Sequence, residues 1–100
     1  MDKIRYYFRL EGSLIMKQFS YVIKEPVGLH ARPAGLLVRQ ANEYHCSITL
    51  KSGDKTADAK KILAVTNMGV TKGQEVIFLL EGEEEEKACE ELKKFMEENL

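Results

Sequence analysis

Residues 28–34 read Gly-Leu-His-Ala-Arg-Pro-Ala and place a nucleophile next to a group that binds anions. The imidazole of His30 is a competent nucleophile near neutral pH, because a large share of it is unprotonated there. The guanidinium of Arg32 is permanently charged and can bind phosphate oxygens in a bidentate manner. The chemistry to expect from this pair is covalent uptake of a phosphoryl group on His30, with Arg32 holding its oxygens.

A structural role for the same residues is the competing interpretation, since a histidine before a helix is usually a cap or a surface residue. The sequence holds no Walker-type glycine-rich loop, no second acid or base beside His30 and no cluster of metal-ligating residues. We therefore expect no metal and no cofactor, and a group carrier in preference to a self-contained enzyme. For His45 and Cys46 we expect a cap or loop role.

Hydrophobic periodicity predicts the elements that position this segment. Residues 17–25 alternate as a half-buried strand, with Phe19, Tyr21 and Ile23 on one face. A helix over 31–44 has its apolar stripe at Ala34, Leu37, Val38, Ala41 and Tyr44. The next predicted elements are a hairpin of strands 47–51 and 55–58, a short helix in 60–67 and a strand over 75–81. A final helix follows, with acidic residues in its first turn (Glu83, Glu84 and Glu85) and apolar residues facing inward (Ala88, Leu92, Phe95 and Met96). This order predicts an α+β fold with helices on one face of a mainly antiparallel sheet.

The start of the first helix explains why the chemistry would lie there. With His30 as N-cap, Ala31, Arg32 and Pro33 form the first turn, whose N–H groups lack partners inside the helix. Proline is tolerated there because it has no N–H to leave unpaired. Free donors and the positive end of the helix dipole both favour an anion, so a phosphoryl group on His30 would be stabilised.

Composition limits the classes of protein to consider. The chain has 100 residues, 44% of them hydrophobic, and a net charge of -1, which fits one domain and argues against bulk attraction to nucleic acid or an anionic membrane. Its apolar runs are far shorter than the ~20 residues of a membrane span. The two cysteines have no CxxC spacing and are expected as free thiols in a reducing cytosol. Regular patterning begins near Met16, so residues 1–15 are expected to be an extension, disordered or from an upstream start, and residues 16–100 the domain.

The motif in residues 28–34, between a strand and a helix, resembles the active-site signature of the HPr family of bacterial sugar phosphotransferase systems. The similarity runs from about Met16 to the C-terminus and includes residues 64–70 (Ala-Val-Thr-Asn-Met-Gly-Val) and Gly82 before the acidic final helix. It implies an open-faced sandwich of four antiparallel strands and three helices, in the order β-α-β-β-α-β-α. It also implies a cytoplasmic, monomeric phosphocarrier that is not an enzyme.

By this resemblance, Enzyme I, charged by phosphoenolpyruvate, donates a phosphoryl group to Nδ1 of His30, and Enzyme IIA domains of sugar transporters accept it. Arg32 and the first-turn amides, that of Ala31 included, would hold the phosphate. The partner surface maps onto Gly35, Arg39, Ile62, Leu63 and Thr66. Packing in the core is an equally good interpretation of Ile62, whereas Leu63 is the better interface residue.

One position departs from the family pattern. The serine that many Gram-positive HPr proteins carry at the start of the second helix is replaced by Lys61. A lysine cannot accept phosphate from the serine kinase, and it fixes a positive charge where phosphoserine would bring roughly -1.5 to -2. We therefore expect a carrier that escapes this regulatory phosphorylation.

Two further hypotheses stay open at the level of sequence. The first is an HPr-like paralogue of a regulatory, nitrogen-type branch, whose phosphorylation state signals instead of supporting sugar uptake. The second is an α+β binding module, for example for RNA, in which His30 is only a helix cap. The second is less favoured because basic residues are not interleaved with aromatic residues along the strands.

Overall fold

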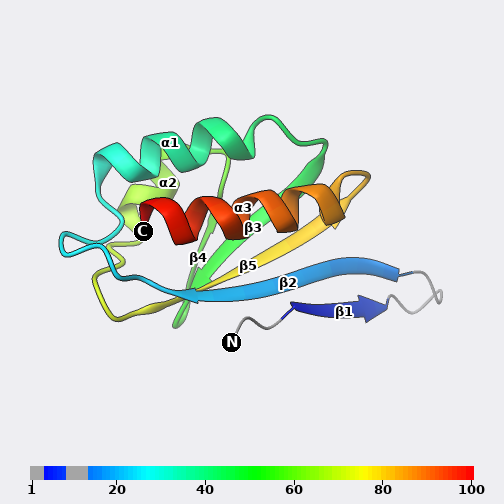
Figure 1. Cartoon of the computed structure of the whole chain (residues 1–100), viewed down its shortest axis with the longest axis horizontal. Coiled ribbons are helices and arrows are strands. Elements are labelled where there is room, and N and C mark those ends of the chain that lie inside the picture. The colour runs from blue at the N-terminus through cyan, green and yellow to red at the C-terminus, as the bar shows by residue number, and fades with distance from the viewer. Residues whose placement is uncertain (1–3, 9–13) are drawn as a thin grey trace.

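The computed structural model describes residues 4–8 and 14–100, with side chains from Lys17 onward. The elements from the second strand onward follow the order that the hydrophobic patterning predicted, and one additional strand precedes them (Figure 1). The elements are β1 (Ile4–Phe8), β2 (Leu14–Val22), α1 (Ala31–Ala41), β3 (Cys46–Ser52), β4 (Lys55–Asp58), α2 (Ile62–Asn67), β5 (Glu75–Gly82) and α3 (Glu85–Asn99).

The strands form one antiparallel sheet in the order β1-β2-β5-β3-β4. The last four of these are the predicted strands, and with the three helices they make the open-faced sandwich that the sequence predicted. β1 is a fifth strand that the patterning did not predict; it pairs with the first half of β2, from Leu14 to Phe19. That residues 1–15 are an extension from an upstream start stays a prediction.

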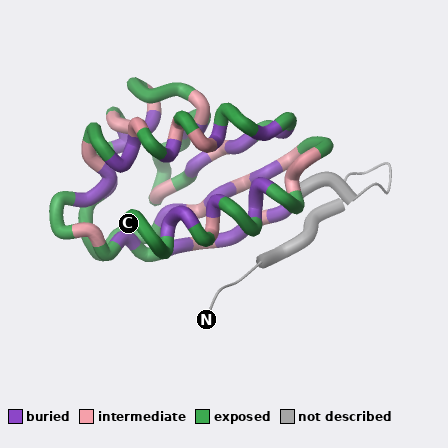
Figure 2. Tube along the Cα trace, turned by 45° about the horizontal axis from the view of Figure 1, so that its top comes forward, coloured by how far each residue is buried: buried purple, intermediate pink, exposed green. Residues whose placement is uncertain are grey.

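The core lies between the helices and one face of the sheet, where Figure 2 shows the buried segments facing each other. Because neighbours directly opposite in an antiparallel pair share a face, the register of β2 and β5 brings Phe19 against Phe78. Their rings stack with centroids 4.5 Å apart. Leu50 of β3 is opposite Phe78 on the other side, and all three side chains are fully buried. The inward residues predicted for the first strand and the last helix are confirmed as buried.

Three predicted helix boundaries were wrong, and so was the end of the first predicted strand, which lies at Val22 and not at residue 25. At each of the three helix boundaries a polar side chain makes an additional hydrogen bond. The first helix ends at Ala41, not at residue 44, where the side-chain amide of Asn42 donates to the Val38 carbonyl at 2.8 Å. Tyr44 is nevertheless buried beyond its end. The second helix starts at Ile62 because Asp58 accepts from the amide of Lys60 at 2.9 Å through its carboxylate and from that of Lys61 at 3.1 Å through its carbonyl.

The last helix begins at Glu85, so Glu83 and Glu84 lie before its first turn. The carboxylate of Glu84 accepts from the His45 amide at 2.6 Å, and that of Glu85 accepts from the Gly82 amide at 3.0 Å. The acidic residues of the first turn are therefore Glu85 and Glu86. No helix within residues 4–8 and 14–100 is long and apolar enough to cross a membrane.

Candidate functional site

His30 is the N-cap of α1, as the sequence predicted, and has extended backbone angles (φ -91°, ψ -174°). The amide of Ala34 donates to its carbonyl at 2.9 Å, which begins the helical hydrogen-bond pattern. The amides of Ala31 and Arg32 precede that bond and have no acceptor inside the helix, and Pro33 has no N–H. The imidazole makes no capping hydrogen bond. Its nitrogens are thus not engaged in holding the helix end.

The loop before His30 is fixed by a second loop far along the chain. The amide of Leu29 donates to the carbonyl of Val70, beyond α2, at 2.9 Å, and the His30 amide donates to the Gly28 carbonyl at 2.9 Å. Gly28 has a φ of +81°, and a Cβ added to it would lie 2.5 Å from the Val70 oxygen. Only glycine fits both the backbone angle and this close approach. The backbone of His30 is therefore fixed by hydrogen bonds at both its N–H and its C=O.

Arg32 is exposed on the first turn of α1, and this turn carries no acidic side chain. Its guanidinium and the open amides of Ala31 and Arg32 give the helix start a local positive charge. The structure thus brings Ala31 and Arg32 to the same end of α1 as His30. An anion bonded to His30 would lie at a helix start that has an exposed guanidinium and fixed backbone dipoles.

A carboxylate that the sequence reasoning did not single out also faces the imidazole. Oε1 of Glu25 lies 4.0 Å from Nε2 of His30, and the two side chains are 27% and 39% exposed. The other oxygen, Oε2, accepts from the amide of Val27 at 2.9 Å. The sequence gives one signal for Glu25, the following Pro26, which restricts Glu25 to extended backbone before a turn.

The predicted partner residues lie on α1 and α2, which pack against each other. Gly35 is half-buried and Arg39 exposed on α1. On α2 the side chains of Ile62 and Leu63 are 41% and 73% exposed, so Ile62 lies at the surface and not in the core. The half-buried Thr66 donates its hydroxyl to the Ile62 carbonyl at 3.0 Å.

Leu36 is a surface residue that the sequence reasoning missed. It lies on α1 between Gly35 and Leu37, and 42% of it is exposed although it is a large apolar side chain. A search for apolar residues that fall outside the helix stripe would have found it, because the stripe contains Leu37 and Val38 and leaves Leu36 outside. With Ile62 and Leu63 it adds apolar surface to the two helices.

Lys61 lies where the sequence placed it, at the start of the second helix, as the N-cap of α2. Its side chain is exposed and makes no capping hydrogen bond, while its carbonyl accepts from the Val65 amide at 3.1 Å. A modification enzyme reaching this helix start would therefore meet an ammonium group and no hydroxyl at this position.

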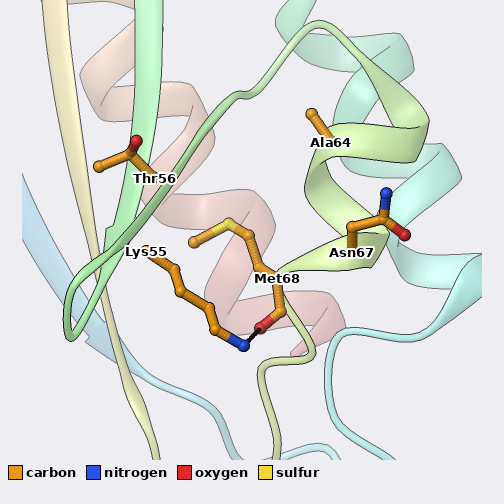
Figure 3. Close-up of a pocket in the computed structure, with 5 residues that line it drawn as sticks. All are labelled: Lys55, Thr56, Ala64, Asn67 and Met68. Atoms are coloured by element: carbon orange, nitrogen blue, oxygen red, sulfur yellow. Dashed lines mark hydrogen bonds between the residues drawn. The ribbon is translucent and has the colours of Figure 1, made fainter.

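Figure 3 shows a groove between β4 and α2 that is distinct from the helix start. Its volume is about 320 Å³, and it is lined by Lys55, Thr56, Ala64, Asn67 and Met68. The ammonium group of Lys55 points to the Met68 carbonyl, at 3.4 Å. None of the predicted phosphate-binding residues lines it. His30 is half-exposed and Ala31 and Arg32 are exposed at the start of α1, away from this groove.

Other titratable groups with altered properties are structural. The buried Tyr44 donates its hydroxyl to Oε1 of Glu91 at 2.7 Å, and burial together with this bond raises the pKa of Tyr44 to about 12. Burial also raises the pKa of the free thiols of Cys46 and Cys89. His45 is an exposed loop residue, as predicted, whereas Cys46 is the buried first residue of β3, so the cap or loop role predicted for it was wrong. Among the described residues no three His, Cys, Asp or Glu side chains are grouped so as to hold a metal ion.

Comparison with known proteins connects this site to a family. Residues 17–98 match the family model described as the PTS HPr component phosphorylation site. The phosphocarrier protein HPr of Mycoplasma capricolum is 33% identical over 81 residues, which cover 81% of this chain and 91% of that protein. The HPr-like protein Crh of Bacillus subtilis is also 33% identical, over 85% of this chain and 100% of its own length.

Solved structures agree with the sequence matches. A structure of the histidine-containing phosphocarrier protein of mycoplasma superposes with a TM-score of 0.79 at 32% identity, covering 81% of this chain and 92% of that chain. The family model covers more than half of the chain and includes residues 28–34, both helices of the predicted partner surface and all but the last residue of α3. The chain therefore belongs to the HPr family, the phosphocarriers of the bacterial phosphotransferase system.

Proposed function

We propose that this protein carries a phosphoryl group on Nδ1 of His30, taken from phosphorylated Enzyme I and passed to Enzyme IIA domains for sugar uptake in the cytoplasm. The observation that carries this proposal is the helix start itself. His30 is half-exposed and makes no capping bond there, beside two amides without a helical acceptor and the exposed guanidinium of Arg32.

Each transfer step needs only groups that this surface and its partner provide. The lone pair of Nδ1 forms a bond to phosphorus, and the bond between phosphorus and the donor breaks, its electron pair leaving with the donor. The amides of Ala31 and Arg32 and the Arg32 side chain stabilise the phosphoryl oxygens during and after transfer. The reverse sequence delivers the group to an acceptor, so the protein is a covalent carrier and not an enzyme.

The partner surface that fits this function is formed by the first two helices. Gly35 and Arg39 of α1 and Ile62, Leu63 and Thr66 of α2 lie on two helices that pack together, and Leu36 extends their apolar surface. An apolar patch with Arg39 near its edge suits an acidic partner docked over His30. We propose that the protein acts in this way as a monomer.

Lys61 supports the proposal that this carrier escapes the serine kinase of the family. The lysine is the exposed N-cap of α2, the position where the resemblance expects a phosphorylated serine. Incubation with that kinase and ATP should leave the mass of the protein unchanged. Incorporation of phosphate at any serine or threonine would contradict this proposal.

The central test is phosphoryl transfer from phosphoenolpyruvate through purified Enzyme I, measured by intact mass and by acid lability of the product. His30→Ala should lose the phosphate completely. His45→Ala is a matched control, because the chain has two histidines and His45 is exposed on a loop away from the helix start. Loss of phosphate in both variants, or in neither, would contradict the assignment to His30.

A structure of Crh, the catabolite repression containing protein of Bacillus subtilis, matches this chain at 32% identity with a TM-score of 0.66, and this supports a second candidate, a regulatory HPr-like paralogue. Such a protein would accept the phosphoryl group on His30 and fail to deliver it to Enzyme IIA domains of sugar transporters. The same assay, extended to sugar-specific and nitrogen-type Enzyme IIA acceptors, separates the two candidates. No phosphorylation with Enzyme I from several sources, the native one included, combined with salt-dependent RNA binding would instead favour the binding-module hypothesis.

A further inference from the structure

We propose that Glu25 is a positioning residue that fixes the proton of the His30 imidazole on Nε2 and so leaves Nδ1 free to accept and release the phosphoryl group. This inference rests on the proposed function of His30. Its structural basis is the approach of Oε1 of Glu25, in the segment between β2 and α1, to Nε2 of His30 at 4.0 Å.

The position of Glu25 is determined by three hydrogen bonds. Its amide donates to the carbonyl of Leu100 at 2.8 Å, after the last turn of α3, and its own carbonyl accepts from the Gly28 amide at 2.9 Å. Its Oε2 accepts from the Val27 amide at 2.9 Å. One carboxylate oxygen is thus used by the turn, and the oxygen that remains, Oε1, is the one that lies toward the imidazole.

The distance of 4.0 Å is too long for a hydrogen bond, so the carboxylate acts on the ring through its charge. Since 27% of the Glu25 side chain and 39% of the His30 side chain are exposed, water screens this interaction only in part. Neutral imidazole has two tautomers, with the proton on Nδ1 or on Nε2. A negative charge beside Nε2 stabilises the Nε2–H form, in which the lone pair lies on Nδ1.

The same charge helps release of the phosphoryl group. With phosphorus bonded to Nδ1, the ring proton is on Nε2, next to the carboxylate. When an acceptor attacks phosphorus, the Nδ1–P bond breaks and its electron pair returns to the ring, while Nε2 keeps its proton. The leaving group is then a neutral imidazole, and no proton has to be supplied from outside.

Glu25→Gln tests the charge with little change of shape, because the side-chain oxygen of glutamine can still accept from the Val27 amide. The first readout is the tautomer ratio of His30, from the ¹⁵N chemical shifts of labelled protein at a pH where the ring is neutral. The second is the rate of phosphoryl uptake from Enzyme I. In Glu25→Gln we expect the ratio of the Nδ1–H to the Nε2–H tautomer to rise about threefold. The rate of phosphoryl uptake from Enzyme I should fall about three- to tenfold.

Glu43→Gln is the control, since Glu43 is an exposed carboxylate beyond the other end of α1, and both readouts should match the wild type. An unchanged tautomer ratio in Glu25→Gln would overturn the proposal, even if the rate fell, because the effect would then come from the turn. If the wild type takes up no phosphate, the proposed function fails. The tautomer ratio still reports separately whether Glu25 fixes the imidazole.

Discussion

Gly28 and Gly35 lie on either side of His30 and are subject to opposite constraints. Gly28 has a φ of +81° and no room for a Cβ beside the Val70 carbonyl, so Gly28→Ala should reduce the free energy of unfolding by about 2–4 kcal/mol. Gly35 is inside α1, and apart from its own helix backbone and chain neighbours no atom lies within 4 Å of an added Cβ, so Gly35→Ala should increase this free energy by about 0.5–1 kcal/mol. Urea unfolding measures both changes, and a shift of the same sign in the two variants would contradict this assignment.

At the scale of residues, the sequence predicted the part of the site that depends on neighbours in the chain. His30 as N-cap and Arg32 in the first turn follow from the adjacent Pro33 and from the apolar stripe of the helix. Glu25 was not predicted, because its approach to His30 depends on how residues 26–29 turn and on the distant carbonyls of Val70 and Leu100. Leu36 was missed although the pattern already places it outside the apolar stripe of the helix, where a side chain is expected at the surface.

At the scale of elements, α2 presents its most exposed apolar side chain, Leu63, beside α1. Leu63→Gln keeps a good helix former and removes apolar contact area, so transfer from Enzyme I should slow by about five- to tenfold. The free energy of unfolding should change by less than about 0.5 kcal/mol. Val22→Thr is the control, since Val22 is 47% exposed on β2 and belongs to no predicted partner surface. Equal slowing in both variants would contradict a specific role for Leu63.

The contribution of Tyr44, which links α1 and α3, to the free energy of unfolding should depend on pH. The folded protein holds the Tyr44 hydroxyl protonated, with a pKa of about 12 against 10.0 in the unfolded chain. A raised folded-state pKa contributes stability that is fully present below pH 10 and is lost as the pH rises through about 12. Tyr44→Phe lacks this contribution, so its deficit in unfolding free energy should shrink over that range. A deficit that stays constant from pH 9 to 12 would contradict this explanation.

Element boundaries show where prediction from periodicity stops. The apolar stripe continues to Tyr44, yet α1 ends at Ala41, with Asn42 as its C-cap. The backbone and side-chain amides of Asn42 both donate to the Val38 carbonyl, and the next two amides donate to carbonyls only three residues back, so the chain turns. Tyr44 is buried although it lies beyond the end of the helix. Its apolar position therefore fits the helical spacing without being part of the helix. The four strands of the domain were predicted from alternation in residues 17–25 and 47–51, from the turn before residues 55–58 and from the apolar run in residues 75–81. β1 depends instead on pairing with the edge of β2.

At the scale of the whole molecule, β1 and the site lie at opposite ends of the sheet (Figure 1). β1 pairs with the first half of β2, while His30 follows the other end of that strand. A protein that begins at Met16 should therefore fold and take up phosphate from Enzyme I within about twofold of the full-length rate. Loss of transfer with retained folding would show that residues 1–15 contribute to the site. Intact mass of the protein from its native source identifies the true start.

The hydrogen bond from the Leu29 amide to the Val70 carbonyl has a consequence for the order of folding. It joins the segment before α1 to the loop after α2, about 40 residues later, so it cannot form within an isolated α1 fragment. The backbone of the histidine loop is thus completed only when both halves of the domain have come together. In hydrogen exchange, the Leu29 amide should open with the slowest, global unfolding events, although the loop to which it belongs reaches the surface.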